Sequence, residues 1–166
     1  MVRPSLRLAQ RSGDTVFVMA CDGLESVCVG RETGSFPIKA LTIEVGTRRP
    51  LGVGAGGLAV LGSMPPEDAR RAIDTIAPKL AEFPLTSPEV MLRGAEQARR
   101  LGYSVSDGQV ATGVRAIAVA VRDVHGAPVG SIGIAAIRSR MMPDRIKELV
   151  PWMMEERAEV ERLLAA

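Results

Sequence analysis

The sequence predicts an α+β domain in which a largely antiparallel sheet is flanked by helices. Two β-forming limbs, residues 114–121 and 129–135, are joined by turn-forming residues that include Asp123 and Gly126, which is typical of a β-hairpin. Helical patterns separate this hairpin from earlier strands, and a long amphipathic pattern follows it. With 166 residues, 46% hydrophobic and 24% charged, the chain has the length and composition of one globular domain with a proper core.

The N-terminal part is predicted to form one helix and three strands. The helix covers Pro4–Arg11 and ends before Gly13, because glycine readily adopts the left-handed conformation that stops a helix. Asp22 and Gly23 are a hairpin signal. The strands are expected at Thr15–Ala20, Ser26–Val29 and Pro37–Val45.

The remaining helices follow from capping residues and apolar stripes. A Gly-rich loop leads into a helix over Ala55–Leu61, and the next helix starts at Pro65 and is ended or kinked by Pro78. Ser87 opens a further helix that Gly102 closes. The last helix is expected over Pro143–Leu164, with a break or bend at Pro151.

The hairpin limbs alternate large and small residues, so they predict two very different sheet faces. One face carries Ile117, Val119, Val121, Ile132 and Ile134. The other carries Ala116, Ala118, Ala120, Ser131, Gly133 and Ala135. A face with so little side chain either packs closely against a helix or forms the floor of a ligand cavity, and the hairpin alone favours neither.

The Gly-rich loop has the spacing of a dinucleotide-binding fingerprint at Gly52, Gly54 and Gly57. That motif needs a buried strand before it and an acidic residue at the end of a second strand, and neither is predicted here. The preferred interpretation is a loop running into a helix whose free N–H groups hold a carboxylate or face solvent.

Several functional classes lack support in the sequence. A net charge of +2 without blocks of like charge predicts neither a nucleic-acid footprint nor a membrane-binding stripe. Two cysteines and one histidine give no metal site, cofactor motif or disulfide framework. The start of the chain lacks an apolar signal segment, and no run is long enough to span a membrane. A cytoplasmic protein is expected.

An enzyme is the weakest of the functions considered. Cys28 is interpreted as a small buried hydrophobe rather than a nucleophile, because no base lies near it in the sequence. His125 falls in the hairpin turn, where a histidine is usually solvated. No paired carboxylates or Ser/Cys–His arrangement is evident.

A set of short motifs, in order along almost the whole chain, resembles the effector-binding domain of IclR-type transcriptional regulators. They are Arg48–Leu51, Gly57–Ala59, Arg100–Tyr103, Gly113–Ala118, Val121–Gly126 and Ser139–Ile146. The resemblance implies a GAF-like fold, with a central antiparallel sheet, helices on one side and a small-molecule pocket on the other. It implies that residues 1–166 are a single regulatory domain of a repressor-type regulator that forms a homodimer or homotetramer. The winged helix-turn-helix that binds DNA in this family is expected to be absent from this chain.

The resemblance also implies the positions that line the pocket. They are Ile38, Leu41, Ala55, Gly56, Gly57, Ser106, Val114, Ala116, Gly133 and Ala135. The hairpin pattern picks Ala116, Gly133 and Ala135 independently.

Members of the family that bind small carboxylic acids tend to carry Asp, Cys, Ser and Ser where this chain has Ser106, Ala116, Gly133 and Ala135, and often Glu at Gln109 and Lys at Leu58. Without those polar groups, the pocket cannot form the hydrogen bonds that would offset the cost of dehydrating a tiny anion. It has room instead for a larger apolar ligand.

The resulting hypothesis is an aromatic or medium-sized organic acid as effector. Its carboxylate is expected on the N–H groups of residues 55–57 and its ring over Ala116 and Gly133. Replacing Gly133 with leucine is expected to abolish binding without unfolding the domain. The alternatives are a vestigial pocket filled by neighbouring side chains, which would leave a ligand-free oligomerisation module, and an enzyme.

Overall fold

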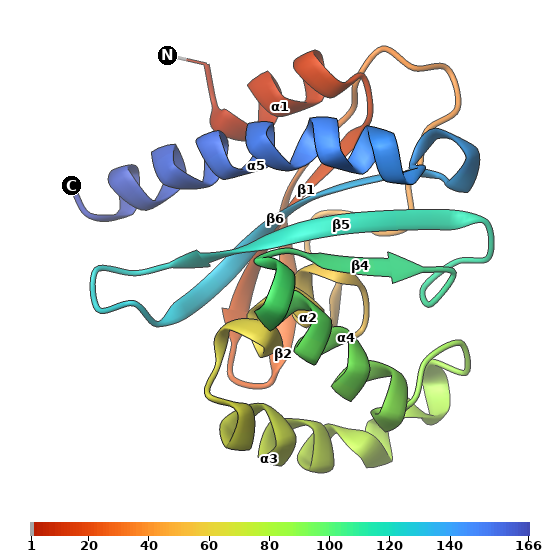
Figure 1. The fold of residues 1–166 in the computed structure, drawn as a ribbon, viewed down its shortest axis with the longest axis vertical. Helices are drawn as coiled ribbons and strands as arrows, with labels where there is room; N and C mark the ends of the chain where they lie inside the picture. Colours follow the sequence, from red (N-terminus) through yellow and green to blue (C-terminus); the bar gives the residue numbers. More distant parts are fainter. Residues whose placement is uncertain (1) are drawn as a thin grey trace.

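The computed structural model of the chain describes residues 2–166. Helices and strands follow one another as shown in Figure 1. In order they are α1 (Pro4–Ser12), β1 (Thr15–Asp22), β2 (Glu25–Glu32), β3 (Arg48–Pro50), α2 (Ala55–Ser63), α3 (Pro66–Ile76), the 3-10 helix η1 (Ala77–Glu82), α4 (Pro88–Leu101), β4 (Ser104–Asp107), β5 (Val114–Arg122), β6 (Pro128–Ile137), the 3-10 helix η2 (Arg138–Arg140) and α5 (Pro143–Leu164).

The strands form one antiparallel sheet in the order β3-β2-β1-β6-β5-β4, which confirms the predicted α+β class. The predicted hairpin is β5 and β6, and its register pairs Ala116 with Ala135 and Ile117 with Ile134. The large and small residues therefore lie on opposite faces, as the alternation predicted. The turn is held by Asp123, whose carbonyl accepts a 3.0 Å hydrogen bond from the N–H of Gly126.

Helices cover both faces of the sheet, not one face only as the resemblance implied (Figure 1). α1 and α5 pack on the face of large residues, where Leu8 and Leu149 join Ile117 in a buried core. α2 packs on the face of small residues, α4 packs on α2, and α3 packs on α4 around a second core that includes Leu58 and Leu61. Any pocket on the small-residue face must therefore lie beside α2.

Local signals placed the helix ends correctly. Gly13 and Gly102 adopt φ angles of 78° and 84° immediately after α1 and α4, and the hydroxyl of Ser87 accepts a hydrogen bond from the N–H of Val90 at the start of α4. α5 was expected to break or bend at Pro151, but it continues through this residue as one helix. None of the helices in residues 2–166 combines the length and the apolar character that a membrane crossing requires.

The strand predicted at Pro37–Val45 is wrong, because these residues belong to an irregular loop over residues 33–47. The edge of β2 is occupied instead by β3, with Ser26 opposite Arg49. The loop crosses the small-residue face, where Ala40 and Ile43 pack against β1 and β2. Two of its apolar residues thus serve the core without any strand pairing.

Candidate functional site

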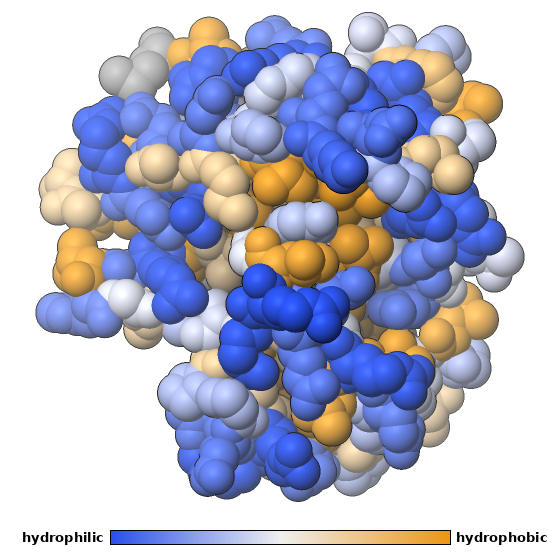
Figure 2. Space-filling view, in the orientation of Figure 1, coloured by the Kyte–Doolittle hydropathy of each residue, from blue (hydrophilic) through white to orange (hydrophobic). Residues whose placement is uncertain are grey.

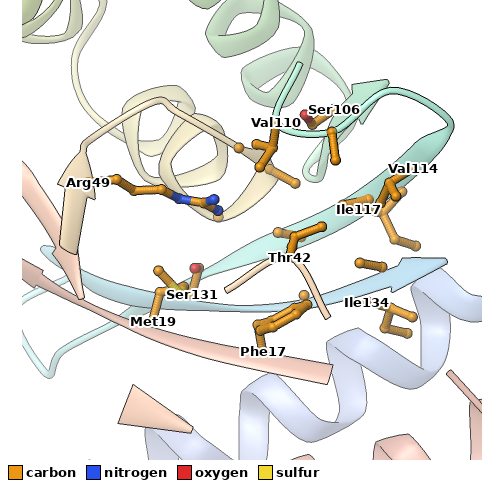
Figure 3. Close-up of a pocket in the computed structure, with 18 residues that line it drawn as sticks. Phe17, Met19, Thr42, Arg49, Ser106, Val110, Val114, Ile117, Ser131 and Ile134 are labelled. Carbon is orange, nitrogen blue, oxygen red and sulfur yellow. The ribbon is translucent and has the colours of Figure 1, made fainter. Parts of the chain in front are cut away.

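The structure contains a cavity on the small-residue face, between β5, β6 and the start of α2 (Figure 3). The backbone of the hairpin forms its floor, and side chains of β1 and β4 stand on either side. Loops before α2 and before β5 close the ends. The lining residues are Phe17, Met19, Thr42, Arg49, Gly54, Ala55, Gly56, Ser106, Val110, Ala111, Val114, Ala116, Ile117, Ala118, Ser131, Gly133, Ile134 and Ala135.

The two interpretations of the small-residue face both apply, each to a different part of it. Ala118 and Ala120 are buried against Ala55 and Ala59 of α2, so this part of the hairpin packs closely against a helix. Farther along the strands, Ala116 packs only partly against this cluster, because it lies beyond the first residue of α2, Ala55. The missing side chains leave the cavity there.

Seven of the predicted pocket positions lie in the cavity wall. They are Ala55, Gly56, Ser106, Val114, Ala116, Gly133 and Ala135.

Ile38, Leu41 and Gly57 do not line the cavity, and these predictions are corrected. Ile38 and Leu41 are 57% and 50% exposed because they lie on the outer side of the irregular loop, from which Thr42 reaches the cavity instead. Gly57 serves close packing: a Cβ at this position would lie 2.1 Å from the backbone nitrogen of Gly52. The glycines of the supposed nucleotide fingerprint therefore fold a loop tightly onto α2, after an antiparallel edge strand rather than within a parallel βαβ unit.

The most informative residue in the cavity, Arg49, was missed at the level of sequence. It lies on β3, where Arg48 points outward to a 2.7 Å ion pair with Asp22 and Arg49 points inward across the sheet face (Figure 3). No residue in the described part of the chain offers the Arg49 guanidinium a hydrogen bond or a carboxylate within 4.0 Å, and its Nε is buried. The available signal was the alternation of a short strand, which turns one of two adjacent arginines inward.

Burial alone dominates the electrostatics of Arg49. Desolvation lowers the pKa of its guanidinium from the usual value, and only the Cys28 thiol acts in the opposite direction. None of the lining residues is acidic. Arginine stays protonated even in such surroundings, so the cavity carries one positive charge that no side chain neutralises.

A second polar group without a partner lies in the same cavity. The hydroxyl of Ser131 is buried and has no hydrogen-bond partner among residues 2–166. It faces the first turn of α2, since a Cβ on Gly56 would lie 2.5 Å from its Oγ. Gly54, the N-cap of α2, has no side chain to satisfy the free N–H groups of that turn. Arg49, Ser131 and the α2 N-terminus thus form the polar end of the cavity.

The opposite end of the cavity is apolar. Val114, Ala116 and Ala135 lie there, packed against Phe17, and Figure 3 shows Val114 away from Arg49 and Ser131. In this arrangement, the space that the centre of a water molecule can occupy has a volume of about 40 Å³. That volume accommodates about three water molecules. A ring-sized ligand needs the walls to move apart, and the loop that carries Thr42 is a wall without helix or strand structure.

Chemistry by a nucleophile receives no support from the geometry. Cys28 is 1% exposed, and burial raises the pKa of its thiol, which disfavours the reactive thiolate. His125 is exposed in the hairpin turn, where its backbone N–H donates to Asp123 Oδ1 at 2.9 Å. Within residues 2–166, no three His, Cys, Asp or Glu side chains gather as metal ligands would.

The comparisons with known proteins identify the family. A family model described as the bacterial transcriptional regulator IclR C-terminal matches residues 2–160. The chain belongs to the IclR family. Among its relatives is the HTH-type transcriptional repressor AllR of Klebsiella pneumoniae, 32% identical over 140 residues that make up 84% of this chain and 51% of AllR. The corresponding repressor of Escherichia coli K12 is 31% identical over the same shares.

Solved structures of IclR-type proteins share the fold. IclR of Thermotoga maritima matches with a TM-score of 0.85 at 24% identity, over 98% of this chain and 66% of that chain. A PobR inducer-binding domain from Acinetobacter, a double mutant in complex with 3-hydroxybenzoic acid, matches with a TM-score of 0.78 at 19% identity, over 96% and 94%. The chain is thus the C-terminal domain of a transcription regulator whose relatives are repressors rather than enzymes.

Proposed function

We propose that this domain senses a small organic acid and passes the bound state to an attached winged helix-turn-helix, which alone contacts DNA. The observation that carries the proposal is the cavity beside α2, with one polar and one apolar end. Proteins use such enclosed, mostly apolar spaces with a few convergent polar groups to bind small ligands. The residues that bind the effector are the lining residues Ala55, Gly56, Ser106, Val114, Ala116, Gly133 and Ala135.

The effector class follows from the walls of the cavity. Most lining side chains are apolar, which favours an aromatic or medium-sized acid over a two-carbon acid that needs hydrogen bonds on every side. The PobR inducer-binding domain in complex with 3-hydroxybenzoic acid supports the capacity of this fold for an aromatic acid.

The cavity is connected to α1, the first helix of the chain, through the backbone and through hydrogen bonds. Phe17 and Met19 line the cavity on β1, the strand that follows α1. The loop that carries Thr42 begins with two backbone hydrogen bonds to the end of α1, from Phe36 N–H to Gly13 and from Gly34 N–H to Asp14, each 3.0 Å long. A ligand that displaces this loop therefore biases the position of α1, and operator affinity changes by differential binding to the two arrangements.

Self-association as a dimer or tetramer in the cytoplasm belongs to the same proposal. Figure 2 shows apolar surface in the middle of one face, framed by hydrophilic residues. Half-buried Tyr103, Val105 and Met154 pack against the core on the α5 side of the sheet. A second copy of the chain would cover such surface. Sedimentation of the purified domain tests this point separately from ligand binding.

A thermal-shift screen with organic acids, from glyoxylate to substituted benzoates, tests the proposed function. A ligand that binds only the folded domain raises the melting temperature with its concentration. Stabilisation by aromatic or longer acids supports the proposal, and stabilisation by glyoxylate alone contradicts the effector class. If no acid stabilises the domain, a ligand-free oligomerisation module becomes the better explanation. The small volume of the cavity is the observation that favours this alternative.

A further inference from the structure

Arg49 differs from the other inward-facing arginines in having no partner at all. Arg99, Arg145 and Arg157 also have a buried Nε without a hydrogen bond, but each has another partner. Terminal nitrogens of Arg99 and Arg145 contact the Met64 carbonyl and Glu148, and Arg157 Nε lies 3.9 Å from Glu161. Arg49 has none of these contacts. Arg49 is partly buried and its Nε is fully so. Partial burial of a charge without a counter-ion is costly, and fold stability gives no reason for its presence.

The guanidinium lies beside the loop that leads into α2. Its terminal nitrogen packs against Gly54, where a Cβ would approach it to 2.4 Å. The same glycine is the N-cap of α2. The guanidinium, the first N–H groups of α2 and the Ser131 hydroxyl therefore converge on one end of the cavity.

We infer that Arg49 is the counter-ion that binds the carboxylate of the effector, and that the effector is a monocarboxylate with an apolar body. This inference rests on the proposed function and deepens it. The planar guanidinium matches a carboxylate through two parallel hydrogen bonds, and Ser131 and the α2 N-terminus supply further donors.

The charge balance of the cavity sets the ligand class. One unneutralised cation matches one anionic group, and among residues 2–166 no second cationic side chain lines the far end of the cavity beside Val114 and Ala116. A dicarboxylate would bury an unpaired charge there, and a phosphate monoester would bring a second negative charge that the single arginine leaves uncompensated. A neutral amide would keep the shape of the acid but forfeit the ion pair.

The test uses two acid–amide pairs, isobutyrate with isobutyramide and benzoate with benzamide, on the wild-type chain and three variants. Arg49→Met removes the charge but keeps an unbranched side chain. Arg49→Lys keeps the charge but cannot form two parallel hydrogen bonds to a carboxylate, and Arg48→Met is the matched control on the same strand. We expect the wild type to bind one acid at least tenfold more tightly than its amide by titration calorimetry. Arg49→Met should weaken that acid by about ten- to a hundredfold, since hydrogen bonds to charged groups contribute about 1.5–3 kcal/mol.

The variants also give a readout that does not depend on affinity for the acid. The acid–amide preference should disappear in Arg49→Met, fall to an intermediate value in Arg49→Lys and persist in Arg48→Met. Without ligand, Arg49→Met should melt at a higher temperature than the wild type, because a partly buried, unpaired charge is removed. If the wild type and Arg49→Met bind the acid equally, or if the wild type prefers the amide, Arg49 is not the counter-ion. If the wild type binds no acid in the wider screen, the proposed function itself is wrong and this inference falls with it.

Discussion

Replacing Asp14 with asparagine should destabilise the domain far more than the loss of an exposed ion pair would, although the two side chains have almost the same volume. The Asp14 side chain is 2% exposed and lies between α1 and the segment after β6. Its Oδ1 accepts a 2.5 Å hydrogen bond from Arg140 Nε, and Arg145 lies 3.7 Å from Oδ2. The same arginines donate to the Ser12 carbonyl, so the cluster joins the end of α1 to η2 and α5.

The magnitude follows from the charge that the change leaves behind. Asparagine keeps the shape and one acceptor, but the half-buried Arg140 loses its carboxylate partner and Arg145 keeps only Glu148, at a cost of about 2 kcal/mol. For a domain of this size, that cost lowers the melting temperature by about 4–8 °C. The assay is thermal or urea unfolding monitored by circular dichroism.

The matched control is Asp22→Asn, which breaks an exposed Asp–Arg pair of 2.7 Å whose carboxylate side chain is 64% exposed. It should change the melting temperature by no more than about 2 °C, because exposed pairs contribute little. Equal melting temperatures for the two variants would refute the reasoning that burial, rather than pairing, sets the contribution of these carboxylates.

Three further predictions concern the cavity, the Gly-rich loop and pH. Ala116→Leu should fill the cavity and abolish acid binding in the thermal-shift screen while circular dichroism stays native. Gly133→Leu, expected from the sequence to leave the domain folded, should instead destabilise it, because a Cβ there meets the Ile117 carbonyl oxygen at 2.9 Å. Gly57→Ala should destabilise by about 3 kcal/mol in urea unfolding through its 2.1 Å clash with Gly52, and Gly30→Ala, whose nearest neighbour is 3.5 Å away, should not. Partial burial raises the pKa of Asp107, but hydrogen bonds from Arg115 and Arg138 outweigh it and bring the pKa below its usual value. Its stabilisation is therefore present at neutral pH and lost as pH falls through that lowered pKa, so the difference in melting temperature between wild type and Asp107→Asn should vanish well below about pH 4.

The parts of the fold that sequence predicted are those decided by neighbouring residues. The hairpin followed from a strict alternation of large and small residues, which fixes both its strands and its two faces. The helix ends followed from Gly13, Ser87 and Gly102, each of which acts within one turn of its own position. The floor of the cavity was predictable for the same reason, since Ala116 and Ala135 lie on the face that the alternation leaves bare.

The missed features depend on partners that are distant in the sequence. Residues 37–45 have the apolar content of a strand, but the edge of β2 was already occupied by β3, and only Ala40 and Ile43 of the loop reached the core. Ile38 and Leu41 were placed in the pocket by the family resemblance, but in this loop their side chains are exposed. β4 is short and mostly polar, and its pairing with β5 comes from the register of the sheet rather than from its own pattern.

Arg49 shows why a binding site inferred from a family's pocket positions alone can omit the residue that carries the main charge. The polar residues expected at positions 106, 116, 133 and 135 are replaced here by smaller ones. That comparison alone predicted a pocket that cannot bind a tiny anion through side chains at these positions. The cation comes instead from β3, at a position that the comparison did not include. A vestigial pocket would be more stable with methionine at this position, because nothing in the cavity neutralises the guanidinium. A charged side chain that lowers stability and has no partner in the fold is best explained by a ligand that supplies the counter-ion. The melting temperature of unliganded Arg49→Met and its loss of acid preference must therefore be measured on the same protein.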